Sequence, residues 1–232
     1  MVILKAISAL LSYPQAELLE VLDDIAALVA EETELSEAET AALLTLLDHY
    51  RRTDLLELQQ TYVELFDRGR ALSLHLFEHI HGESRDRGQA MVDLLRVYRS
   101  NGFELAAREL PDYLPLFLEY LAQRPREEAI DWLRGALPVL NLLGARLEER
   151  QSPYAALFDA LSATVGGTID LAAREMAAAE GPDDTLARMD EIWEEEAVRF
   201  MANADGCQRP AGESQPVKFS RPHRDPKQRR VG

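Results

Sequence analysis

A helical spacing of apolar residues recurs almost from end to end of this chain and limits the folds open to it. The segment near the N-terminus places Leu18, Val21, Leu22, Ile25 and Leu28 three or four residues apart, as on one face of a helix. Leu, Ala and Glu favour helices, whereas Val, Ile and Thr are too sparse for a large sheet. We therefore predict an all-α fold, a single bundle of roughly eight to ten helices.

Local signals predict where several helices begin and end. Ser36 and Glu39 have the spacing of a capping box ahead of an apolar stripe. Asn101-Gly102 is typical of the end of a helix, because glycine readily adopts the left-handed conformation found there. Pro111-Asp112 is expected to open a later helix, with the Asp112 carboxylate near its positive end.

The charge divides the chain into two predicted parts, a helical domain at 1–201 and a disordered basic tail at 202–232. The tail contains four prolines and carries seven Lys or Arg against three acids. Because the whole chain carries −16 and the tail +4, residues 1–201 carry −20. Cys207, the single cysteine, lies in this tail, so neither an intramolecular disulfide nor a cysteine-ligated cluster within one chain is expected.

This acidity restricts the possible partners. Nucleic acid is excluded because phosphate binding needs a basic surface, and docking on anionic lipid is disfavoured for the same reason. The expected partner is a basic segment of another protein. No apolar run reaches the length that spans a bilayer, so we expect no direct membrane insertion. Because a single cysteine cannot form an intramolecular disulfide, we expect a reducing, cytoplasmic location.

His75, Glu78 and His79 spell H-x-x-E-H, in which two histidines one helical turn apart bind zinc and the glutamate acts as base. A zinc-dependent hydrolase is therefore the alternative function. Such enzymes need a third ligand from a distant segment and sheets that this sequence lacks. The structural alternative, which we favour, is inward packing of the neighbouring apolar residues, namely Leu74, Leu76, Phe77 and Ile80.

Two segments carry a resemblance to a known family. The stretch YVELFDRGRALSLHLFEHIHGESRDRGQAMVDL, Tyr62–Leu94, resembles the delta-subunit family of nitrate reductase molybdenum cofactor assembly chaperones, within the wider TorD-like family. Glu109, Pro111 and Asp112 resemble an E-x-D-H type motif of the wider family, but Tyr113 stands where many relatives have histidine. The resemblance spans about residues 1–200.

The resemblance implies a chaperone and not an enzyme. It would bind the apo catalytic (alpha) subunit of a respiratory nitrate reductase, chiefly through that subunit's N-terminal segment, and keep it competent for insertion of molybdenum cofactor and of an iron–sulfur centre before membrane docking. Its partners would extend to molybdenum cofactor biosynthesis proteins. No stably bound cofactor or metal is expected in the chaperone itself.

A client helix could lay its apolar face in a groove between helices. The candidate lining residues are Tyr62, Phe66 and Tyr113, with core packing as the alternative for the first two. The acidic groups expected to receive basic client residues are Asp67, Glu78, Glu83 and Asp112. The residues expected to organise the intervening loop are His75, His79, Gly82 and Arg87.

Overall fold

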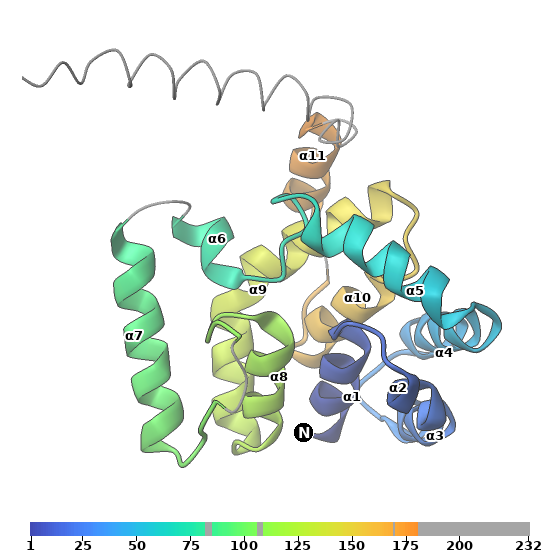
Figure 1. Ribbon diagram of the computed structural model, residues 1–232, viewed down its shortest axis with the longest axis horizontal. Coiled ribbons are helices and arrows are strands. Elements are labelled where there is room, and N and C mark those ends of the chain that lie inside the picture. Colours follow the sequence, from blue (N-terminus) through green and yellow to red (C-terminus); the bar gives the residue numbers. More distant parts are fainter. Residues whose placement is uncertain (82–84, 106–108, 169, 181–232) are drawn as a thin grey trace, which may run out of the picture. The chain divides into compact units, whose positions relative to one another are not determined.

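The computed structural model describes residues 1–81, 85–105, 109–168 and 170–180. These residues form eleven α-helices and one π-helical turn, and they contain no β-strand beyond a single isolated bridge (Figure 1). The all-α prediction is confirmed for this part of the chain. The elements are α1 (Val2–Leu11), α2 (Ala16–Glu20), α3 (Leu22–Glu31), α4 (Glu37–Arg52), α5 (Leu55–Tyr62), the π-helical turn (Val63–Asp67), α6 (Leu76–His81), α7 (Arg85–Ser100), α8 (Leu114–Ala122), α9 (Arg126–Glu149), α10 (Ala155–Thr164) and α11 (Leu171–Glu180).

One continuous apolar core connects α1 to α10. The strongly apolar helix α1 packs against α8, α3 and α10, while α9, the longest helix, contacts α6, α8, α10 and α11. Tyr50 and Tyr154 strengthen the centre of this core, because the Tyr50 hydroxyl lies 2.9 Å from the Leu10 carbonyl and 2.7 Å from the Tyr154 hydroxyl. These buried hydroxyls therefore have partners, as burial requires.

The predicted helix ends are mostly where the local signals place them. Ser36 and Glu39 form the capping box of α4, with both reciprocal hydrogen bonds present. Helix α7 ends at Ser100, and Gly102 has a φ of 73°, the left-handed conformation that glycine adopts without strain. Helix α8, however, begins at Leu114 and not at Pro111-Asp112, because the preceding residues pair with another segment.

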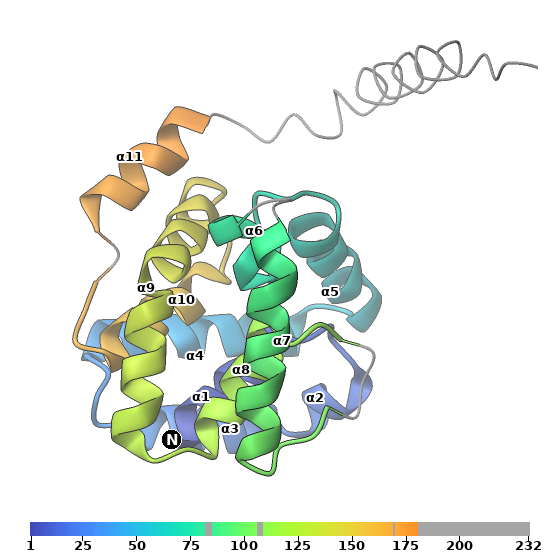
Figure 2. The same ribbon diagram turned by 90° about the vertical axis from the view of Figure 1, so that its left-hand side faces the viewer.

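Helix α7 lies at the edge of the bundle, outside α8, as both views show, and α6 contacts α7 and α9 (Figures 1 and 2). Near its C-terminal end α7 is fixed by Tyr98, whose fully buried hydroxyl donates to the Pro111 carbonyl at 2.8 Å. Its middle contributes Leu94 to the core.

Within the described residues, no helix combines the length and apolarity required to cross a bilayer. The boundary predicted near residue 201, the basic tail and Cys207 lie outside these residues.

Candidate functional site

Two chain segments meet beside α6 and position its N-terminus. The Leu76 N–H donates to the Asp112 carbonyl at 3.0 Å, and the Leu114 N–H donates to the Leu74 carbonyl at 2.8 Å, which together make the isolated antiparallel bridge. The loop before the bridge is held from α9 by Arg146, whose guanidinium donates to the Ala71 carbonyl at 2.6 Å. The start of α6 is therefore fixed to the start of α8.

The carboxyl group of Asp112 is fully buried at the end of this bridge. Its Oδ2 accepts from the Phe77 N–H at 3.1 Å, while its main-chain carbonyl already accepts from Leu76. The first N–H groups of a helix have no partner inside that helix. Asp112 thus caps α6 from 35 residues away, and its negative charge lies at the positive end of the helix.

An imidazole ring and a guanidinium group face this buried carboxylate. Nδ1 of His75 lies 3.5 Å from Oδ1 of Asp112, at the long end for a hydrogen bond, and Arg87 of α7 lies 4.0 Å from Oδ2. The nearby Asp112 carboxylate raises the pKa of His75, although partial burial of the ring opposes this.

The guanidinium of Arg87 also pairs with the carboxylate of Glu78 in α6, at 2.9 Å, and this ion pair connects α7 to α6. Burial acts to raise the pKa of Glu78, but a hydrogen bond with Ser73 and the charge of Arg87 lower it overall.

The H-x-x-E-H residues do not form a zinc site in this arrangement. His75 precedes α6, so it does not share a helix with His79. Its ring faces Asp112, and Nε2 of His79 lies 2.8 Å from the Ser73 carbonyl. No three His, Cys, Asp or Glu side chains among the described residues are placed to hold one metal ion.

The predicted aromatic lining residues lie mainly in the core. Tyr62 and Phe66 are 3% and 5% exposed, with ring centroids 5.0 Å apart, as the core-packing alternative expects. Tyr113 is partly buried, and its hydroxyl lies 2.9 Å from that of Tyr62. Asp67 is largely exposed. The part of its carboxyl group that is shielded from water, together with the negative charge of Glu109, raises its pKa. No observation tests contact of these residues with a client, which stays a prediction.

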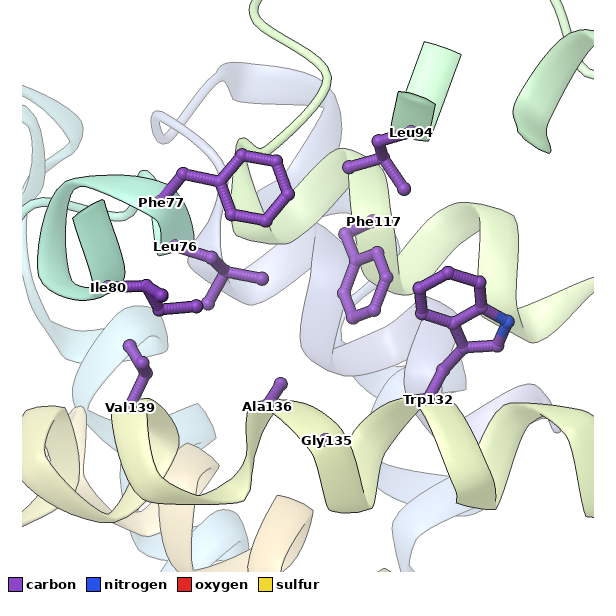
Figure 3. Close-up of a pocket in the computed structure, with 9 residues that line it drawn as sticks. All are labelled: Leu76, Phe77, Ile80, Leu94, Phe117, Trp132, Gly135, Ala136 and Val139. Carbon is purple, nitrogen blue, oxygen red and sulfur yellow. The ribbon is translucent and has the colours of Figure 1, made fainter. Parts of the chain in front are cut away.

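A groove opens to solvent between α6, α7, α8 and α9 (Figure 3). Its volume is about 220 Å³, and all of its lining residues are apolar or glycine. Figure 3 shows α9 forming one side, with α6, α7 and α8 contributing side chains opposite. The lining consists of Leu76, Phe77, Ile80, Leu94, Phe117, Trp132, Gly135, Ala136 and Val139.

Comparison with known proteins decides the family. The family model described as nitrate reductase delta subunit matches residues 31–160, more than half of the chain. The nitrate reductase molybdenum cofactor assembly chaperone NarJ of Escherichia coli K12 is 49% identical over 208 residues, which cover 89% of this chain and 88% of the relative. The chain belongs to the nitrate reductase delta subunit family.

Two further relatives extend this result. The probable assembly chaperone NarW of Escherichia coli K12 is 45% identical over 89% of this chain and 87% of its own length. The probable NarJ of Bacillus subtilis 168 is 35% identical over 69% of this chain and 86% of its own length. Because these members of the delta subunit family are named as assembly chaperones and not as catalysts, the prediction of a chaperone and not an enzyme is confirmed.

Sequence reasoning missed the groove of this delta subunit family member. Inward packing was predicted for Ile80, which is wrong, because Ile80 is 52% exposed and lines the groove. Trp132 was not selected, yet it is 37% exposed on the same groove. A signal was present in α9, where Trp132 and Gly135 stand at helical spacing from the buried Ala136 and Val139, so that the apolar surface of the helix continues from the core to the outside.

Of the residues predicted to organise the loop, His75, His79 and Arg87 make the contacts described above. Gly82 and Glu83 lie outside the described residues.

Proposed function

We propose that this chain is a system-specific chaperone that binds the apo catalytic subunit of a respiratory nitrate reductase and keeps it competent for molybdenum cofactor insertion before membrane docking. The names of the relatives, which specify assembly of nitrate reductase and its molybdenum cofactor, support this client. The observation that best supports client binding is the apolar groove, which is open to solvent in this member of the chaperone family.

The groove suits a short amphipathic helix. Its α9 side runs from Trp132 to Val139, seven residues apart, which is about 10 Å along a helix or two turns. A client helix with apolar residues at i, i+3 or i+4 and i+7 would bury them against this stripe. We assign this helix to the N-terminal segment of the catalytic subunit.

The net negative charge of residues 1–201 favours a basic client segment. Two of its acids, Asp93 and Asp131, are exposed on α7 and α9, two of the helices that form the groove. Their ion pairs with Arg96 and Arg134 are solvent-exposed and therefore weak. Together with the net −20 of residues 1–201, they would attract Lys and Arg beside the client's apolar face.

The remaining assignments follow from this role. The chaperone would work in the cytoplasm, beside molybdenum cofactor biosynthesis proteins. It would hold the client open for molybdenum cofactor and for the iron–sulfur centre, without stably binding either group itself. Asp112, His75 and Arg87 would act by fixing α6, whose side chains form one wall of the groove.

Replacing Ile80 with aspartate tests this proposal. Ile80→Asp puts a charge on the groove wall, so binding of the synthetic N-terminal peptide of the catalytic subunit should weaken by about 2 kcal/mol, roughly thirty-fold. Because Ile80 is about half exposed, the unfolding free energy of the Ile80→Asp protein should differ from that of the wild type by only about 0.5 kcal/mol. Isothermal titration calorimetry and urea unfolding measure the two quantities.

Leu56→Asp is the matched control, since Leu56 is an exposed apolar residue of α5 outside the groove. It should bind the peptide as the wild type does. Equal binding by wild type and Ile80→Asp would rule out the groove as the client site.

A further inference from the structure

We propose that Gly135 is the specificity-determining position of the groove, where the missing side chain leaves space for one large apolar anchor residue of the client helix. This inference rests on the function proposed above. It adds which position selects the client and what kind of side chain is selected.

The backbone does not require glycine at this position. Gly135 lies inside α9, away from the left-handed conformation, and an added Cβ would meet nothing within 4 Å. Glycine in a helix interior lowers stability relative to alanine. Glycine at position 135 therefore does not stabilise α9. Its effect is to leave open space on the groove side of the helix.

Large side chains surround this small position. Trp132 lies nearly one turn before Gly135 and Val139 about one turn after it, with Ala136 beside it, and Figure 3 shows Phe117 near Trp132 on the groove. Gly135 and Ala136 therefore leave a gap between the larger side chains of Trp132 and Val139, and we call this gap the hole. The close approach allowed by glycine and alanine brings a client helix near α9.

The lining selects the chemistry of the anchor. All nine residues around the space are apolar or glycine, so a charged or amide side chain buried there would lose its hydrogen bonds to water without replacement. A volume of about 220 Å³ has room for a leucine, phenylalanine or tryptophan side chain. We assign a large apolar residue of the catalytic subunit's N-terminal helix to this space.

The test is to fill the hole in the full-length chain and titrate it with the synthetic N-terminal peptide. Gly135→Leu should weaken binding about ten-fold or more, because the added side chain occupies the anchor's space. Gly135→Ala should weaken it less, while both variants keep or raise the thermal unfolding midpoint. Gly88→Leu is the control, since Gly88 is also helical, exposed and free of neighbours within 4 Å, but lies outside the groove.

A complementary change in the peptide identifies the anchor. Each large apolar residue of the peptide is replaced in turn by alanine, and one replacement should bind Gly135→Leu more tightly than the unmodified peptide does. That compensation is a coupling between two residues, which general damage to the fold would not produce.

Several results would overturn the inference. If Gly135→Leu binds as the wild type does while Ile80→Asp does not bind, the groove is the client site but Gly135 does not select the anchor. Equal losses in Gly135→Leu and Gly88→Leu would also reject it. If the wild type is a dimer by light scattering and Gly135→Leu is a monomer, a second copy occupies the hole. A wild type that does not bind the peptide removes the proposed function itself.

Discussion

At the scale of single residues, Asp112 is the buried charged group on which the position of α6 depends. It is fully buried, it accepts from the Phe77 N–H, and it faces His75 and Arg87. Asp112→Ala leaves that N–H without its acceptor and removes the negative charge that His75 and Arg87 face, so the unfolding free energy should fall by about 3 kcal/mol in urea titrations.

The isosteric variant separates the cap from the charge. Asp112→Asn keeps an oxygen for the Phe77 N–H and should lose only about 1 kcal/mol. An alanine variant as stable as the wild type would show that Asp112 does not hold α6.

The contact of His75 with Asp112 makes stability depend on pH. The folded-state pKa of His75 is raised, so its stabilising contribution is complete below the ordinary histidine pKa of about 6.5 and is lost as pH rises through the raised value. Urea unfolding of wild type and His75→Gln should therefore differ most near pH 6 and converge at alkaline pH. A difference that grows with pH would contradict this assignment, and an NMR titration of the ring measures the pKa directly.

At the scale of elements, α6 depends on its neighbours. A helix of six residues is unstable alone, and α6 is held by Asp112 at its start and by Arg87 of α7 at Glu78. Arg87→Met should loosen this connection, so amide hydrogen exchange should accelerate in α6 and the first turns of α7 while α10 stays protected.

Arg96→Met provides the comparison for that experiment, because Arg96 is exposed on the same helix and pairs only with its neighbour Asp93 among the described residues. It should leave exchange in α6 unchanged. Unchanged exchange in Arg87→Met would mean that the ion pair with Glu78 does not hold α7 against α6.

Helix ends were predictable from the sequence because their signals are local. Ser36 reaches Glu39 within one turn, and Gly102 ends α7 through its own backbone conformation. Asp112 could not be assigned in this way, because its partner Phe77 is 35 residues distant and its carboxylate caps α6 instead of α8.

The groove could not be predicted from the sequence because it, too, depends on contacts between distant segments. Periodicity shows that α9 has apolar residues, but not that Trp132 and Gly135 are exposed on a groove while Leu133 and Leu140 are buried in the core. Which stripe is covered depends on where α6, α7 and α8 pack. Sequence reasoning therefore found the fold, while Tyr62 and Phe66, which were predicted to line a client site, are buried in the core.

At the scale of the whole molecule, the distribution of charge predicts how binding responds to salt. Residues 1–201 carry −20, so attraction to a basic client peptide should be screened as the salt concentration rises. Salt does not weaken apolar burial, and some salts strengthen it. Calorimetric affinity should therefore fall from low to high salt. Affinity that is unchanged or rises would assign binding to the apolar groove alone.

We propose that this chain holds the catalytic subunit of nitrate reductase before its cofactor is inserted. The most direct test is a pull-down with the full-length chain from nitrate-respiring cells that can or cannot make molybdenum cofactor, with the captured proteins identified by mass. The catalytic subunit should be captured strongly from cells lacking the cofactor and weakly from cells that contain it. Failure to capture this subunit, or equal capture of its apo and cofactor-loaded forms, would contradict the account.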